Sequence, residues 1–368
     1  MNERLEELYN DYWLRQNKIP LLAIYSLKNS AVLTAPYNAT RYLLRNLFAK
    51  INWKIKSVNI QDHKWLDNDY VLRNYRFQRN SIFYGGAAFP VFNPNLGPDI
   101  LGAICGCDIK FGKSGFNGTS WAIHNIKDFN NCPDIKFDEN NIWWKRIYDL
   151  TVAAVNDSNG DYEVGITDLH PGTDSLVSLR GPEELCMDLF DCPEQVLKFN
   201  SQIFEVYKEV YNRLDEAIMK KQKGRTNWSQ IYGKDKWYVV SSDFSGMLSR
   251  DHYEEFVVPG IKLETEFLDK SIYHLDGVGA LHHLDRILQF DRINGVQWVP
   301  GVGKPPMREW IPTLKKIQDA GKNLFLNVEP EDVIPLTESL DKRGLYMNTY
   351  VITQRHAQQL IDYVESRK

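Results

Sequence analysis

The sequence predicts an α/β fold of the (β/α)8 barrel type, and three observations support this prediction. Eight short apolar runs have the composition of strands that are buried on both faces. Helical patterns follow these runs along the chain, and such alternation is typical of a parallel sheet. Several of the runs end in polar residues, and ligands of parallel α/β folds bind at the carboxyl ends of the strands.

The elements are assigned in order from apolar runs and from apolar residues spaced three to four apart. The expected strands cover residues 19–25, 81–87, 163–170, 237–243, 271–277, 296–299, 323–330 and 344–349. The expected helices cover residues 3–16, 41–50, 96–106, 142–155, 181–189, 193–222, 249–268, 278–290, 307–320, 331–341 and 354–366. Ser249 is expected to cap one helix, and Gly321 to end another. Residues 55–80 show no clear pattern.

The segment over residues 88–140 is rich in Gly, Pro and Asn, and it is too long for a plain connection. Long connections of this kind are more often functional insertions than linkers. Within it, residues 120–126 are expected to form a strand of a side hairpin. We therefore expect a single barrel domain over residues 1–368, with an insertion after the second strand that lies over the barrel mouth.

The amino-acid composition limits which partners and which cellular compartment we expect for this protein. The net charge of -4 and the pI near 6.1 give no reason to expect a nucleic acid or an anionic membrane as partner. No apolar run approaches the roughly 20 residues needed to cross a bilayer, and the N-terminus lacks the apolar core of a signal peptide. We expect a cytoplasmic protein that acts on a small molecule. The sequence does not indicate an oligomeric state.

Polar side chains gather where the expected strands end. His274 and Asp276 are two positions apart on one strand, so their side chains share a face. Carboxylates beside imidazoles can transfer protons, and they can equally bind a metal. Any one of them could instead be a capping residue, whereas the convergent set favours a binding site. The polar residues at these strand ends are Tyr25, Ser26, Asp168, His170, Asp243, His274, Asp276, Gln297, Trp298, Asn327, Glu329, Asn348 and Tyr350.

Five short segments, at residues 179–185, 189–194, 243–249, 273–277 and 297–301, carry a resemblance to a known family. Together they resemble the uroporphyrinogen decarboxylase superfamily. That superfamily also contains methyltransferases that move methyl groups between corrinoid proteins and a thiol. The resemblance is best from Gly181 to the end, roughly half of the chain, and weaker signs lie over residues 84–90 and 96–98.

The resemblance implies a (β/α)8 barrel with its site at the carboxyl ends of the strands. The related methyltransferases hold zinc through a His-x-Cys pair after this fifth strand and a later Cys, whereas here the pair is His274-x-Asp276. The related decarboxylases bind tetrapyrrole carboxylates through arginines after the first strand, where this chain has only Lys28. The alternative that the sequence leaves is a metal site made of His, Asp and Glu.

We expect methyltransferase-like chemistry on a small polar organic substrate. Zinc and a corrinoid-bound methyl donor are the implied cofactors, and a corrinoid protein is the implied partner. The alternatives are a decarboxylase (a lyase) acting on a tetrapyrrole-like substrate, and a non-catalytic binder of a sugar or corrinoid. The expected catalytic residues are His274, Asp276, Asp243 and Asp168; the expected substrate-binding residues are Tyr25, His170, Gln297, Trp298, Asn348 and Tyr350; the expected metal ligands are His274, Asp276 and Glu329.

Overall fold

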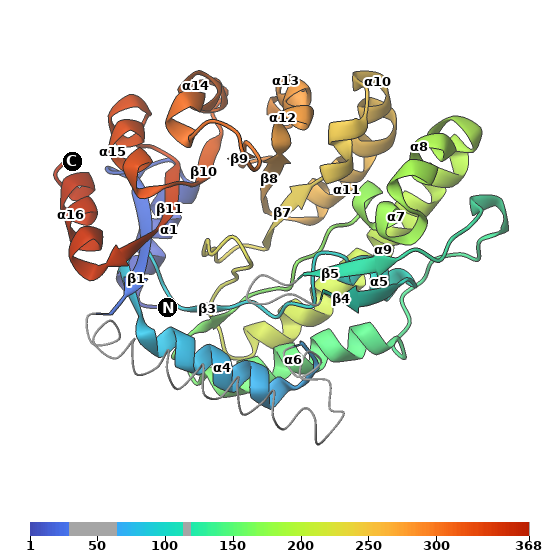
Figure 1. Ribbon diagram of the computed structural model, residues 1–368, viewed down its shortest axis with the longest axis horizontal. Helices are drawn as coiled ribbons and strands as arrows, with labels where there is room; N and C mark the ends of the chain where they lie inside the picture. The colour runs from blue at the N-terminus through green and yellow to red at the C-terminus, as the bar shows by residue number, and fades with distance from the viewer. Residues whose placement is uncertain (29–64, 113–118, 368) are drawn as a thin grey trace.

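A seven-stranded sheet forms the centre of the molecule in the computed structural model, which describes residues 1–28, 65–112 and 119–367 (Figure 1). Its neighbouring strands are in the order β2-β1-β11-β10-β9-β8-β7, and every pair except β1 with β2 is parallel. The strands are β1 Leu21–Leu27, β2 Ile82–Gly86, β7 Trp237–Ser241, β8 Lys270–Asp276, β9 Gly295–Val299, β10 Asn323–Asn327 and β11 Leu345–Thr353.

Two small sheets complete the strand set. β3 (Val91–Phe92) pairs with β6 (Glu163–Val164) in parallel, and β4 (Asp108–Phe111) pairs with β5 (Ser120–Ile123) as an antiparallel hairpin. The hairpin confirms the strand expected at residues 120–126. The described ladders do not join β3 to β1 or β6 to β7. The mixed α/β class with a central parallel sheet is thus confirmed, while closure into a barrel and the division into barrel and insertion stay predictions.

A side chain rather than a ladder connects the third expected strand to β7. The Tyr238 hydroxyl accepts a hydrogen bond from the Leu169 backbone N–H at 2.9 Å, and it donates one to the Thr167 carbonyl. One isolated parallel bridge links Ile166 to Asn227 on the loop before β7. The strand expected over residues 163–170 is therefore present only in part. Its ladder consists of Glu163 and Val164, which pair with β3.

The strand expected at residues 81–87 exists, but its direction was predicted wrongly. β2 runs antiparallel to β1, with Ala23 opposite Gly86 and Leu27 opposite Ile82. It directly follows a helix over the segment that showed no pattern, α4 (Asn68–Ser81), and returns along the edge of β1. Gly86 makes this possible, because a Cβ there would lie 2.2 Å from the Leu22 carbonyl oxygen and its φ is +62°.

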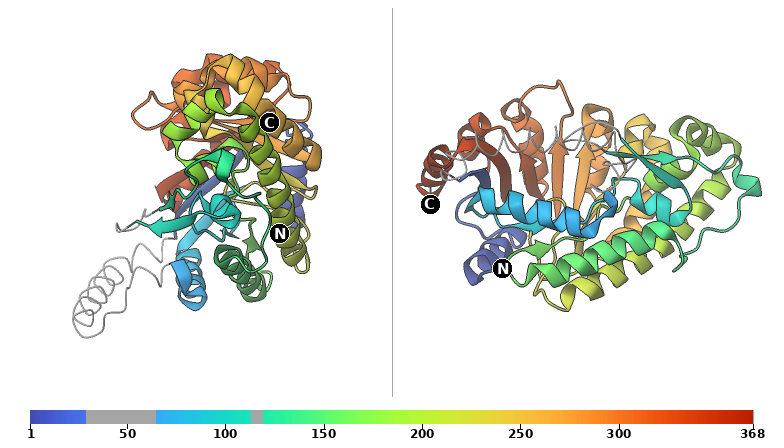
Figure 2. Two further views of the ribbon diagram at one scale, coloured as in Figure 1. Left: turned by 90° about the vertical axis from the view of Figure 1, so that its right-hand side faces the viewer. Right: turned by 60° about the horizontal axis from the view of Figure 1, so that its bottom comes forward.

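Helices α10 to α16 lie along the outer face of strands β7 to β11 (Figure 1). Helices α4, α6 and α9 lie on the opposite side of the molecule (Figures 1 and 2). The helix expected at 41–50 lies outside the described residues. The helices are α1 Glu3–Trp13, α5 Ile100–Cys105, α6 Ile142–Ser158, α7 Thr173–Arg180, α8 Pro182–Asp191, α9 Pro193–Met219, α10 Arg250–His252, α11 Val258–Phe267, α12 Gly277–Ala280, α13 Leu284–Leu288, α14 Ile311–Asp319, α15 Pro330–Ser339 and α16 Gln354–Glu365.

Two of the expected long helices are interrupted. The one over residues 249–268 begins at its predicted cap, because the Ser249 hydroxyl accepts from the His252 N–H. It then passes through a π-helical turn, Tyr253–Val257, before α11, which carries a proline in its first turn. Proline has no N–H to donate, so the helical register shifts at that point. The one over 278–290 divides into α12, a 3₁₀ turn and α13.

Successive side chains along the strands of the central sheet point alternately into two different apolar cores. Ile272, Phe325 and Tyr346 pack on the inner face against Tyr9 and other aromatics of α1. The residues between them face the outer helices, and together they form the larger core. Because side chains alternate along a strand, His274 and Asp276 follow Ile272 on the inner face. None of the described helices has the length and apolar character of a membrane span.

Ile272 lies directly beneath the polar end of β8 and is fully buried. Ile272→Ala is expected to lower the free energy of unfolding by about 2–5 kcal/mol, since it removes buried apolar atoms and leaves a cavity. Urea denaturation of the two proteins measures this difference. Ile352→Ala is the control on β11: its side chain is 82% exposed, and the expected change is within about 0.5 kcal/mol. Equal effects of the two substitutions would contradict the inner-face packing.

Candidate active site

A layer of polar side chains lies above the inner apolar core, at the carboxyl ends of the strands. The parallel register places His274 opposite Ser241 on one side and Gln297 on the other. Further along the sheet, Asn327 is opposite Asn348. Period-two alternation and the register of the ladders together bring these polar groups into one layer.

Gln297 fixes the orientation and the tautomer of His274. Its side-chain oxygen lies 2.6 Å from His274 Nδ1. An amide oxygen only accepts hydrogen bonds, so Nδ1 donates its proton to Gln297, and in the neutral form of the ring the lone pair is on Nε2. Trp228, from the loop before β7, meets the ring edge to face at 5.4 Å. A histidine whose other nitrogen is held in this way is oriented as metal ligands are.

Asp243, His274 and Asp276 form a compact group of donors. One ligand atom from each lies within 4.8 Å of the others, and His274 Nε2 is 4.0 Å from Asp243 Oδ1. The pKa of Asp276 is raised by burial and by the charge of Asp243, while His274 acts to lower it. This group therefore concentrates negative charge beside one imidazole, and a cation would relieve that charge.

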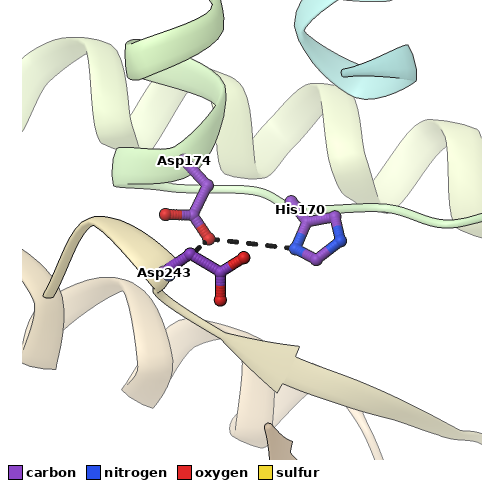
Figure 3. A group of neighbouring side chains, drawn as sticks. All are labelled: His170, Asp174 and Asp243. Atoms are coloured by element: carbon purple, nitrogen blue, oxygen red, sulfur yellow. Dashed lines mark hydrogen bonds and ion pairs between the residues drawn. The ribbon is translucent and has the colours of Figure 1, made fainter. Parts of the chain in front are cut away.

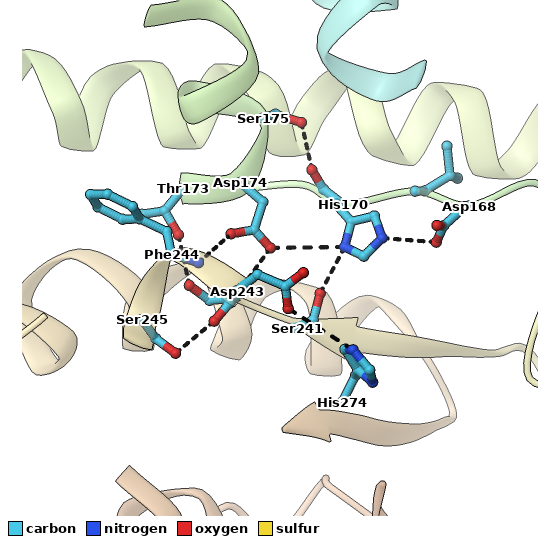
Figure 4. Close-up of polar contacts among 12 residues, drawn as sticks. Asp168, His170, Thr173, Asp174, Ser175, Ser241, Asp243, Phe244, Ser245 and His274 are labelled. Atoms are coloured by element: carbon cyan, nitrogen blue, oxygen red, sulfur yellow. Dashed lines mark hydrogen bonds and ion pairs between the residues drawn. The ribbon is translucent and has the colours of Figure 1, made fainter. Parts of the chain in front are cut away.

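His170 stands at the centre of a second group (Figures 3 and 4). Its Nε2 lies 2.9 Å from Asp168 Oδ1, and its Nδ1 lies 3.0 Å from the Ser241 hydroxyl. Burial by itself would lower the pKa of His170. The charge and hydrogen bond of Asp168, with the charges of Asp174 and Asp243, outweigh burial and raise the pKa to about 10. His170 is therefore an imidazolium at neutral pH.

Asp174, in the first turn of α7, ties that helix to the end of β7. Its two oxygens accept the backbone N–H groups of Asp243 and Phe244 at 2.9 and 3.0 Å (Figure 4). Burial and the nearby charge of Asp243 raise its pKa to about 6. Donor atoms of His170, Asp174 and Asp243 also lie within 4.8 Å of one another. Both nitrogens of His170 have oxygen partners in this group, and its carboxylates favour the protonated ring.

A cleft of about 560 Å³ opens beside the second group. The β4–β5 hairpin and the start of α5 form one wall, and α7 and the turn after β7 form the other. Its polar lining includes Asp99, His124, His170, Asp174 and Asp243, and its apolar lining is Pro98, Trp121, Ala122, Val177, Pro182, Phe244 and Met247. The site thus has room for a small organic molecule next to its acid and base groups.

The structure brings together most of the predicted residues: Asp168, His170, Asp243, His274, Asp276 and Gln297. Tyr25 and Tyr350 stack on each other at 5.0 Å in a different part of the polar layer. Glu329 is exposed beyond β10 and belongs to neither donor group. Trp298 faces the outer helices, where it is fully buried against Trp310, so it does not share the face of Gln297.

Three residues of the site were not predicted from the sequence. Asp174 lies on α7, a helix that was not expected, although an acidic residue just after Pro171-Gly172 is a typical helix start. Ser241 was included only within the strand over residues 237–243. Trp228 lies on a loop, and nothing in the sequence indicates that this loop reaches His274.

No protein-family model and no curated protein matches the chain. Among solved structures, the fold is similar to that of a methyltransferase from Methanosarcina mazei, with a TM-score of 0.57 and 10% sequence identity. The similarity covers 98% of each chain. It shows a shared fold, and membership of the uroporphyrinogen decarboxylase superfamily stays a prediction.

The imidazolium of His170 can be tested by NMR. Its ring is expected to titrate near pH 10, well above the ordinary 6.5. The stability that this pair contributes is complete below about pH 6.5 and is lost as the pH rises toward 10. Ring nitrogen shifts followed from pH 5 to 11 measure the pKa, and a His170→Gln variant identifies the signal.

Asp168→Asn removes the largest source of this shift, so the pKa of His170 should fall in that variant. Met247→Ala serves as the control, because Met247 lines the cleft without touching the histidine network. A ring that titrates near pH 6.5 in the unmodified protein would refute the charged state.

Proposed function

We propose that the protein is an enzyme that transfers a methyl group, with Asp243, His274 and Asp276 holding a divalent metal. The observation that carries this proposal is the Asp243–His274–Asp276 group, whose histidine is oriented by Gln297 at the carboxyl end of a parallel sheet. The methyltransferase fold of the similar structure supports the type of reaction. A closed barrel around this site is part of the proposal.

The donor set fits a metal that accepts both nitrogen and oxygen ligands. One imidazole nitrogen and two carboxylates make three protein ligands, the number with which catalytic zinc sites keep a position open for substrate. They match softer, thiolate-preferring metals less well, because none of the three offers sulfur. When bound, the metal would supply a Lewis acid that holds the nucleophile accepting the methyl group.

The protein's own residues have distinct parts in this scheme. Gln297 orients the ring of His274 by accepting from Nδ1, so that Nε2 faces the carboxylates of the group. Asp174 positions the backbone of Asp243 through two hydrogen bonds. With a pKa near 6, Asp174 can also exchange a proton close to neutral pH, which suits a general acid or base. His170 balances part of the negative charge.

The substrate is proposed to be a small organic molecule bound in the cleft beside Asp174. A corrinoid-bound methyl donor, delivered by a corrinoid protein, and a cytoplasmic location remain part of the proposal. The convergence of two carboxylates on His274 favours chemistry over passive binding. Decarboxylation of a tetrapyrrole has less support, since the described lining of the cleft includes neither Arg nor Lys to bind several carboxylates.

The metal can be tested directly with zinc titrations of chelator-treated protein. We expect the unmodified protein to bind zinc, and we expect His274→Ala and Asp276→Asn each to weaken binding by at least about tenfold, because each removes a ligand. Glu329→Gln is the control, since Glu329 lies outside the donor group. Calorimetry gives the affinities. Zinc binding that is absent, or that depends on Glu329 and not on His274, would overturn the assignment.

A further inference from the structure

The cleft beside Asp174 combines two features that one class of ligand satisfies together. Three carboxylates line it, those of Asp99, Asp174 and Asp243. The rest of its lining is largely apolar, with the aromatic rings of Trp121 and Phe244 among it. We propose that the cleft binds a small organic cation of the alkylated ammonium type.

The negative charge of the cleft disfavours an anionic ligand. Among the described lining residues the basic side chains are His124 and His170, with no Lys or Arg. His170 is already paired with Asp168, which lies on the side away from the cleft lining. An anionic ligand would therefore face three carboxylates without a strong cationic partner. Even a divalent metal at Asp243 would leave negative charge in excess.

The apolar wall separates an organic cation from a hydrated inorganic one. A small metal ion needs oxygen ligands or water on all sides, and a wall of proline, alanine, valine and methionine offers none. Alkyl groups on nitrogen can instead contact that wall while the positive charge faces aromatic rings and carboxylates. Trp121 and Met247 at this wall are 66% and 59% exposed, so apolar surface is available for such contacts.

This inference concerns what the cleft binds, and that binding does not depend on the proposed metal or on the proposed methyl transfer. The test is isothermal titration with choline and with 3,3-dimethyl-1-butanol, in which a neutral carbon replaces the charged nitrogen. We expect choline to bind saturably and the neutral analogue to bind at least about tenfold more weakly, because the analogue has the same shape without the charge. Equal affinity for both, or no saturable choline binding, overturns the inference.

Matched variants locate the site. Trp121→Ala is expected to weaken choline binding roughly fivefold or more, and Trp121→Lys to abolish it by placing a cation at the mouth. Ile123→Ala is the control, because Ile123 lies two residues along the same strand, is 48% exposed and is outside the cleft lining. Choline affinity that is unchanged in Trp121→Lys, or lost equally in Ile123→Ala, would refute the assignment.

The same titrations repeated after chelator treatment separate the two proposals. Choline binding that persists without zinc supports the cleft whatever the fate of the metal site. If His274→Ala abolishes choline binding while Trp121→Lys leaves the affinity for choline unchanged, the cation binds at the metal group. That outcome would overturn the inference.

Discussion

The position of Asp243 depends on a pair of hydrogen bonds from the backbone to Asp174. They join the first turn of α7 to the residues that follow β7. Asp243 belongs to both donor groups, so its placement sets the distance of each histidine from a common carboxylate. Hydrogen bonds to a carboxylate are stronger than those between neutral groups, but here Asp174 is ionised only in part near pH 6. Protonation of Asp174 therefore weakens the link that holds the site together.

The site keeps more negative charge than its histidines can balance. His170 is held charged by its neighbours, whereas the ring of His274 is held in orientation by Gln297. These two histidines are alike in chemistry and lie at the ends of adjacent segments. Their partners differ: both nitrogens of His170 have close oxygen partners, whereas Nδ1 of His274 is held by an amide oxygen and its Nε2 faces Asp243 at 4.0 Å.

The sequence predicted the inner half of this site because strands obey simple rules. A continuous apolar run that ends in polar residues fixes where a strand stops, and alternation places His274 and Asp276 on one face. The direction of β2 was not predictable in this way, since an apolar run has the same pattern in either direction. Asp174 was missed because α7 is short and its residues resemble a polar turn. Trp228 reaches His274 through tertiary packing of a loop, which leaves no periodic signal.

A fold shared with a methyltransferase determines where strands end, and it leaves open which donors stand there. In this chain the position after His274 on the inner face is a carboxylate, Asp276, and not a thiol. A thiol must lose a proton to bind a metal, while a carboxylate is ordinarily ionised already at neutral pH. The raised pKa of Asp276 reduces that advantage, because burial and Asp243 both favour its protonated form. A bound cation would reverse this effect, so the site's unbalanced charge is itself a driving force for taking up a cation.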